Sequence, residues 1–175
     1  INTPQLLMLS GIGDPDELAQ HSIAVKSPLR GVGKNLQDHI TAMVKYSRKT
    51  PGPFLKNMRL DRVALALAQA KLFGTGFASD LPSGVMAFLK TDSSLPAPDV
   101  QLLFHAGALG AAPYLPPFKP GFVDGFSCRV VLLRPESRGS VMLKSADPLA
   151  APRVRQNFLS SDKDRATIRA GVRML

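Results

Sequence analysis

The sequence that decides the fold begins with TPQLLMLSGIG at residues 3–13 and continues with GVGKNLQDH at residues 31–39. In the first segment Thr3 is a candidate N-cap, and Pro4 suits the first helical turn. Gly11 suits the left-handed residue that commonly ends a helix. The pattern therefore predicts a short helix with well-defined ends.

The second segment combines a flexible bend with three polar side chains. Glycines permit the bend, Asn35 can hydrogen-bond nearby backbone, and a carboxylate at Asp38 stands beside an imidazole at His39. Such a turn can fix an extended chain by hydrogen bonds alone, which is our first interpretation of these three residues. Direct contact with a cofactor is the alternative interpretation.

A third segment, RPESRGSVMLKSADPLAAP at residues 134–152, suits two tight turns around a strand. The three segments, in this order, resemble the flavin-dependent glucose-methanol-choline (GMC) oxidoreductases. The first matches the end of a family signature, S/T-P-x-L-L-x-x-S-G-I-G, the second matches V-G-x-N-L-x-D-H, and the third matches P-x-S-R-G-x-V-x-L-x-S-x-D-P. In the family the first motif lies deep inside a much longer chain. We therefore expect an internal piece of a larger enzyme, inactive on its own.

The resemblance implies an α+β fold in two parts. Residues 1–40 would be the tail of an FAD-binding Rossmann-like domain. Residues 41–175 would form a substrate-binding cap domain with a mainly antiparallel sheet and flanking helices. The family's C-terminal region would start near residue 134 and be incomplete.

The resemblance also implies FAD as the cofactor of the full-length protein, with Asn35, Asp38 and His39 as its candidate contacts. The substrate would be a small-molecule alcohol whose CH–OH carbon gives a hydride to the flavin. In the family a histidine, with a second histidine or an asparagine, takes the hydroxyl proton. These residues would follow Leu175, so no catalytic residue is assigned within the chain.

Local patterns predict the remaining elements. Strands are predicted at 23–25, 41–47, 85–89, 100–104, 128–133 and 141–144, and the last two are expected to pair as an antiparallel hairpin. Helices are predicted at 14–21, 59–73 and 160–175, the first of them capped by Asp14 in a capping box with Glu17. Residues 74–84 and 106–125 are predicted to be irregular loops, since the latter segment is rich in proline.

The sequence contains no complete motif for a dinucleotide loop, a metal site or a nucleophilic triad. The glycine pairs at residues 11–13, 31–33 and 74–76 each lack the third glycine of a dinucleotide loop, which in the family lies upstream. His21, His39 and His105 share no metal-ligand spacing, and G-x-S-x-G is absent. We expect no metal site and no nucleophilic triad.

Composition limits the partners and cellular locations that the sequence allows. The 175 residues are 45% hydrophobic and carry a net charge of +9, but Lys and Arg are scattered and not clustered with aromatics, so nucleic acid is not an expected partner. Cys128 is the single cysteine and lies in an apolar strand, typical of a buried thiol. No leader peptide or transmembrane segment is recognised, which favours a cytoplasmic location. The sequence does not specify an oligomeric state.

The substrate is expected to contact the loops at 74–84 and 106–125, because loops on a rigid sheet commonly carry specificity. Choline dehydrogenases typically show N-x-x-E-A-G-G-F before the strand that holds Phe88, and here Ser83 or Gly84 stands near the place of that glutamate. A quaternary ammonium needs aromatic and acidic groups. A neutral or aromatic alcohol is therefore at least as compatible. The alternative function is a non-catalytic domain that binds a ligand or partner.

Overall fold

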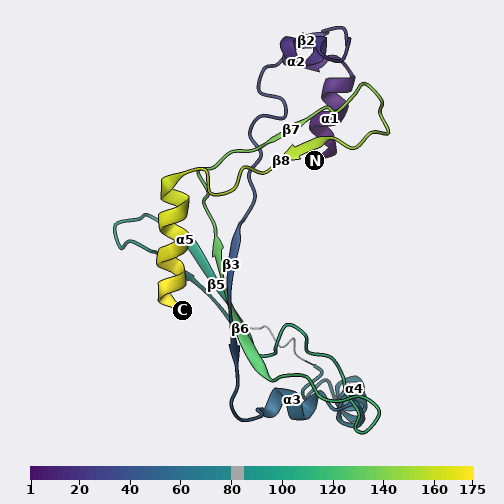
Figure 1. The fold of residues 1–175 in the computed structure, drawn as a ribbon, viewed down its shortest axis with the longest axis vertical. Helices are drawn as coiled ribbons and strands as arrows, with labels where there is room; N and C mark the ends of the chain where they lie inside the picture. The colour runs from purple at the N-terminus through teal and green to yellow at the C-terminus, as the bar shows by residue number, and fades with distance from the viewer. Residues whose placement is uncertain (80–84) are drawn as a thin grey trace. The chain divides into compact units, whose positions relative to one another are not determined.

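A computed structural model describes residues 1–79 and 85–175, and these residues form two compact units (Figure 1). Unit 1 comprises residues 1–40 and 134–166, and unit 2 comprises residues 41–133 and 167–175. Two of the three changes of unit, at residues 40 and 134, coincide with positions marked by the sequence, and the third follows residue 166. Assignment of the units to flavin and substrate domains stays a prediction. The end of the expected loop at 74–84, with Ser83 and Gly84, lies outside the described residues.

Unit 1 is built from short elements around a small apolar core. They are α1 (Asn2–Leu9), β1 (Ile12–Gly13), α2 (Pro15–Ala19), β2 (Ser27–Pro28), β7 (Ser140–Met142) and β8 (Arg153–Arg155). β1 pairs with β2 in parallel, and β7 pairs with β8 antiparallel. The core consists of Met8, Leu18, Met142 and Leu143, so the two sequence segments of the unit share one apolar cluster.

The opening motif folds largely as its residues predict. Gly11 has a φ of +83° and follows the C-cap of α1, and a Cβ there would lie 2.4 Å from the Ala24 carbonyl oxygen. Asp14 caps α2, but its carboxylate accepts from the Asp16 backbone N–H at 3.2 Å and not from that of Glu17. The expected N-cap at Thr3 is wrong, because α1 already begins at Asn2.

The strand expected at residues 23–25 is also wrong. The strand forms slightly later, at β2, because the Gly11 carbonyl accepts the N–H groups of Lys26 and Ser27 and that of Gly13 accepts the N–H of Leu29. The partner positions are thus set by the backbone of β1. Apolar side chains at residues 23–25 gave no information about this pairing.

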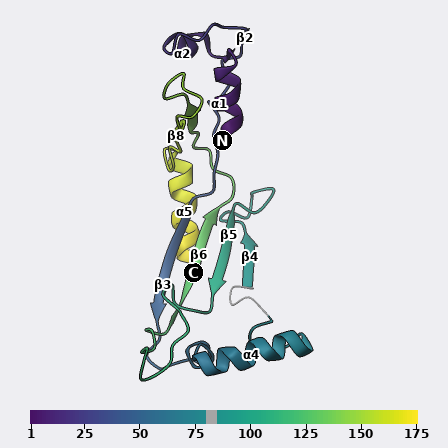
Figure 2. The same cartoon turned by 90° about the vertical axis from the view of Figure 1, so that its right-hand side faces the viewer.

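Unit 2 contains a four-stranded antiparallel sheet in the order β3-β6-β5-β4, visible side by side in Figure 2. Its strands are β3 (Thr41–Ser47), β4 (Val85–Leu89), β5 (Val100–His105) and β6 (Gly125–Leu132), with helices α3 (Pro53–Asn57) and α4 (Leu60–Phe73). The last residues of α5 (Asp162–Met174) pack on the sheet, where a Cβ at Gly171 would lie 2.5 Å from Val130 Cγ1. The expected mixed fold with an antiparallel sheet is confirmed, whereas a Rossmann-like tail stays a prediction.

The expected hairpin between residues 128–133 and 141–144 is wrong. β6 is a central strand whose two edges pair with β3 and β5, so it has no free edge for β7. β7 instead pairs with β8, aligning Ser140 with Arg155 and Met142 with Arg153. Proximity in sequence suggested the wrong partner, since strand pairing depends on which edges are already occupied.

The predicted helix at 59–73 is confirmed as α4, with Arg59 at the N-cap and Gly74 in the left-handed conformation after its end. Its apolar side chains are less buried than the pattern suggested. Val63 and Ala70 are half-buried, but Leu67 is 57% exposed and no α4 residue is buried. Among the described residues, no helix combines the length and apolarity needed to cross a bilayer.

Candidate functional site

An apolar pocket of about 350 Å³ lies in unit 2, beside helix α3 and the end of strand β5. Its described lining residues are Phe54, Met58, Phe77, Ala78, His105, Gly107, Ala108 and Ala111. The two loops expected to line a substrate site supply five of them. This volume falls within the range of about 300–1,000 Å³ that is typical of small-molecule sites.

The wall of the pocket is positioned by a buried carboxylate. Asp124, 5% exposed, accepts the Gly52 N–H at 2.6 Å and the Gly125 N–H at 2.9 Å. Gly52 is the N-cap of α3, and Pro53 at the first helical position presets the backbone. Asp124 therefore ties the start of α3 to the start of β6, and Phe54 projects from that anchored turn.

Phe54 is enclosed by other rings and by a glycine. Its ring contacts Phe77 edge to face at a centroid distance of 5.8 Å and Phe122 at 6.3 Å. A Cβ at Gly107 would lie 2.4 Å from Phe54 Cε1, so only glycine fits opposite the ring. The pocket thus has a packed aromatic wall, with little room for Phe54 to move without displacing its neighbours.

His105 adds a polar group to this apolar surface. It is the last residue of β5, aligned with Ser127 of β6, and it is half-buried. Among the described lining residues it alone has a titratable side chain, and none is acidic. The arrangement suits an uncharged, largely apolar ligand with one hydrogen-bonding group. Sequence reasoning gave His105 no role, since a lone histidine at a strand end carries no spacing signal.

The turn at residues 31–39 in unit 1 borders a second pocket, of about 250 Å³. Asn35 lines it, together with Ile1, Pro4, Gly31, Gly33, Leu36 and Val141. Asp38 and His39 are not among the lining residues. Both are exposed, and Asp38 Oδ1 accepts the His39 backbone N–H at 2.8 Å. The structure therefore places only one of the three candidate cofactor contacts in this pocket.

Backbone hydrogen bonds hold the turn against the strand β7. Leu36 and Gly139 exchange two hydrogen bonds, at 3.1 and 2.8 Å, and the Val141 N–H donates to the Gly33 carbonyl at 2.7 Å. Gly33 has a φ of +74°, and a Cβ there would lie 2.1 Å from the Val141 carbonyl oxygen. The glycine thus permits both the left-handed bend and the close contact with β7.

Ion pairs also hold the turn at residues 31–39 against the start of α2. Lys34 and Arg30 both pair with the buried carboxylate of Asp14, the cap of α2, Arg30 at 3.0 Å. The Lys34 hydrogen bond is the largest influence on the pKa of Asp14, which lies below its ordinary value. Asp14, directly after the first motif, therefore links it to the turn by ion pairs, and Val32 packs against the core that contains Met8.

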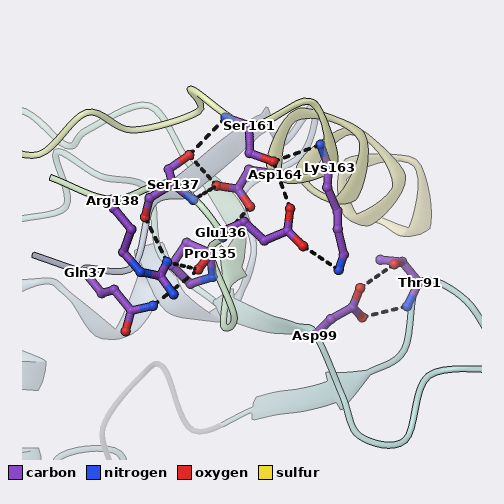
Figure 3. A network of polar contacts seen from close by, with 10 residues as sticks. All are labelled: Gln37, Thr91, Asp99, Pro135, Glu136, Ser137, Arg138, Ser161, Lys163 and Asp164. Carbon is purple, nitrogen blue, oxygen red and sulfur yellow. Dashed lines mark hydrogen bonds and ion pairs between the residues drawn. The ribbon is translucent and has the colours of Figure 1, made fainter. Parts of the chain in front are cut away.

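A buried polar cluster fixes the turn that precedes β7 (Figure 3). Asp164, 2% exposed, accepts the backbone N–H groups of Glu136 at 2.8 Å and Ser137 at 2.9 Å, and the Ser137 hydroxyl at 2.5 Å. Burial alone would raise the pKa of the Asp164 carboxyl, but these hydrogen bonds outweigh burial and lower it. The cluster therefore serves the fold, as expected of residues in the S-R-G turn.

Comparisons with known proteins agree with the family resemblance that the sequence motifs indicated. Residues 135–175 match the family model described as GMC oxidoreductase. The chain is 34% identical to the oxygen-dependent choline dehydrogenase of Brucella anthropi and 34% identical to the chloroplastic fatty acid photodecarboxylase of Chlamydomonas reinhardtii. In both cases the match covers 99% of this chain and 31% of the relative.

A solved structure of the formate oxidase of Aspergillus oryzae, concerned with its FAD modification, superposes with a TM-score of 0.75 at 28% identity. That match covers 99% of this chain and 34% of the oxidase. The chain thus spans about a third of the length of the proteins that it matches. A further relative, from Mycobacterium bovis and 32% identical, is named a GMC-type oxidoreductase, and the chain belongs to the GMC oxidoreductase family.

Proposed function

We propose that the chain forms the substrate side of an FAD-dependent oxidoreductase that acts on the CH–OH group of an alcohol. Family membership supports the reaction class. The single observation that carries the proposal is the pocket in unit 2, with an aromatic wall held by Asp124 and one imidazole at its edge. Such a site can hold an organic ligand away from water and orient it by one hydrogen bond.

FAD is the cofactor that the relatives indicate, and it would supply the acceptor for the hydride. The candidate contacts in this chain have suitable chemistry. Asn35 and His39 are exposed, and their side chains hydrogen-bond no other described residue, while Asp38 uses one carboxylate oxygen on the chain itself. An amide, an imidazole and a carboxylate are thus available to a ligand with both donors and acceptors.

The pocket favours an uncharged alcohol with an apolar or aromatic substituent. The residues that line it include Phe54 and Phe77, but no acidic side chain occurs among those described. A quaternary ammonium would be attracted to the faces of the aromatic rings, but no carboxylate among the described lining residues would balance its charge. His105 would donate or accept one hydrogen bond with the ligand, while the group that takes the hydroxyl proton is expected beyond Leu175.

The relatives do not determine the substrate by identity alone. A choline dehydrogenase and a fatty acid photodecarboxylase are equally identical to this chain, at 34%. Since the two differ in the reaction that they are named for, the chemistry of the pocket is the better guide to the ligand.

Steady-state kinetics on the full-length protein would test the proposal. We expect flavin absorbance in the purified protein and a higher kcat/KM for benzylic or longer aliphatic alcohols than for choline. Turnover of choline as the preferred substrate would contradict the proposed substrate class. A flavin-loaded protein that binds such alcohols without oxidising them would instead favour the alternative, a ligand-binding domain without catalysis.

A further inference from the structure

A third, more polar pocket lies in unit 1, beside the β7–β8 pair. Its volume is about 500 Å³, and its described lining residues are Arg138, Gly139, Ser140, Arg155 and Asn157. Two of these five residues carry guanidinium groups, and none is acidic. The proposed alcohol site does not include this pocket, because the apolar pocket is lined by other residues in unit 2.

The strand pairing brings the pocket residues together. Ser140 of β7 is aligned with Arg155 of β8, so their side chains lie on the same face of the two-stranded sheet. A Cβ at Gly139 would lie 2.0 Å from the Arg155 carbonyl oxygen. Glycine at this position therefore permits the close approach of the two backbone segments beneath the pocket.

Among the described residues, no acidic side chain forms an ion pair with the Arg138 guanidinium. This guanidinium donates to the carbonyl oxygens of Pro135 at 2.7 Å and Ser137 at 3.1 Å, which are neutral acceptors. Its charge lowers the pKa of Asp164 through space, but the Asp164 oxygens accept from Ser137 and the Glu136 N–H. With its amide oxygen turned toward the guanidinium, Gln37 is a third neutral acceptor for Arg138. Arg138 is thus oriented by uncharged oxygens, and its positive charge is available to attract an anion.

The positive charge of Arg155 is not neutralised by a neighbouring carboxylate among the described residues. Its side chain is exposed, and among the described residues no acidic side chain forms an ion pair with it. The segment from residue 134 to residue 166 contains seven basic and four acidic residues, so the surroundings are also positive. Both guanidinium groups line the pocket, so an anion bound there would be attracted by two positive charges.

Asn157 lines the pocket and is fixed by its side chain. It has a φ of +53°, and its side-chain Nδ2 donates to the Arg138 carbonyl at 2.9 Å and to Ser160 Oγ at 3.2 Å. Asparagine is tolerated in the left-handed region more readily than most residues. These contacts connect the segment that follows β8 to the Arg138 backbone.

We propose that this pocket binds the phosphate or carboxylate group of a small molecule. Guanidinium groups bind both kinds of oxyanion through paired, charge-assisted hydrogen bonds, and the Ser140 hydroxyl adds a further donor. The pocket is within the size range of small-molecule sites, so the anion would be one group of a larger organic ligand. The proposal does not depend on the proposed alcohol oxidation.

Calorimetric titration of the full-length, flavin-loaded protein tests this proposal, with inorganic phosphate and citrate as separate probes at constant ionic strength. We expect one or both anions to bind, and Arg155→Gln to raise Kd by at least about tenfold, as loss of a charge-assisted pair should. Arg155→Lys, which keeps the charge but loses the planar fork, should fall between wild type and Arg155→Gln.

Arg153→Gln is the matched control. It removes the same charge from the same strand, at an exposed residue that does not line the pocket, and it should leave Kd unchanged. The anion with the lower Kd, phosphate or citrate, is the oxyanion type that the site prefers. Absence of binding by both anions, equal weakening by Arg153→Gln and Arg155→Gln, or loss of flavin absorbance on saturation with phosphate would overturn the proposal.

Discussion

The Ser137 hydroxyl donates a 2.5 Å hydrogen bond to the Asp164 carboxylate, across 27 residues of sequence. This contact joins the turn before β7 to the first turn of α5. Asp164 also accepts two backbone N–H groups there, so one buried carboxylate satisfies three donors. The S-R-G turn and Asp164 of α5 thus form one hydrogen-bonded unit.

Replacement of Asp164 should therefore destabilise unit 1. Asp164→Asn removes the charge and places an amide where donors converge, which should lower the free energy of unfolding by about 1.5–3 kcal/mol. Urea denaturation followed by circular dichroism would measure it. Asp162→Asn is the control, because that side chain is 96% exposed, and it should cost less than about 1 kcal/mol. Equal effects of the two substitutions would contradict the assigned role.

Acid should weaken the same cluster. The Asp164 pKa is lower in the folded protein than in the unfolded chain, so the unfolded state binds more protons as pH falls. The stability from this group is present above the unfolded pKa, near 3.8, and is lost as pH falls through the lower folded pKa. Stability measured from pH 6 downward should thus fall less steeply in Asp164→Asn than in wild type. Parallel curves would exclude Asp164 as a source of the acid sensitivity.

The glycine opposite Phe54 offers a test of the apolar pocket. Gly107→Ala would place a Cβ 2.4 Å from the ring, so the ring must move and the pocket must change shape. We expect kcat/KM for a benzylic alcohol to fall by about tenfold or more, as for other misfits in apolar pockets. Gly110→Ala is the control, since no atom lies within 4 Å of a Cβ there. Unchanged kinetics in Gly107→Ala would place the substrate elsewhere.

Gly33 should tolerate no side chain. Gly33→Ala combines a φ of +74° with a contact of 2.1 Å to the Val141 carbonyl oxygen, and should cost about 2 kcal/mol or more. Thermal unfolding would show a lower Tm. Gly31→Ala, in the same turn but with open space around its Cβ, should change Tm little. A stable Gly33→Ala protein would mean that the turn can separate from β7.

Flavin retention would separate the two interpretations of the polar turn. If its side chains contact FAD, Asn35→Ala and His39→Ala should each lower the ratio of flavin to protein absorbance in the full-length protein. Gln37→Ala is the control, because its exposed amide is engaged within the chain, by Arg138 and by the Pro135 carbonyl at 3.5 Å. Full flavin content in both test variants would leave the turn with a purely structural role.

Local sequence determined the elements whose signals are local. The capping carboxylate of Asp14, the left-handed residues Gly11 and Gly74, and the alternation in Thr41–Ser47 each act through neighbours in the chain, so the helices α2 and α4 and the strand β3 could be located in advance. The motifs also indicated the family. Thr3 was misassigned as a cap because a helix can begin earlier than its strongest signal.

Tertiary structure decided which separate segments meet. β6 lies between β3 and β5, so β7 pairs with β8, and that pairing helps to place Arg155 and Arg138 in the lining of one pocket. His105 reaches the apolar pocket because β5 ends beside α3, a relation that its own neighbours in sequence do not encode. Caps and turns are fixed by interactions over a few residues, whereas strand partners and pockets depend on contacts between segments far apart in the chain, whose energies no local pattern specifies.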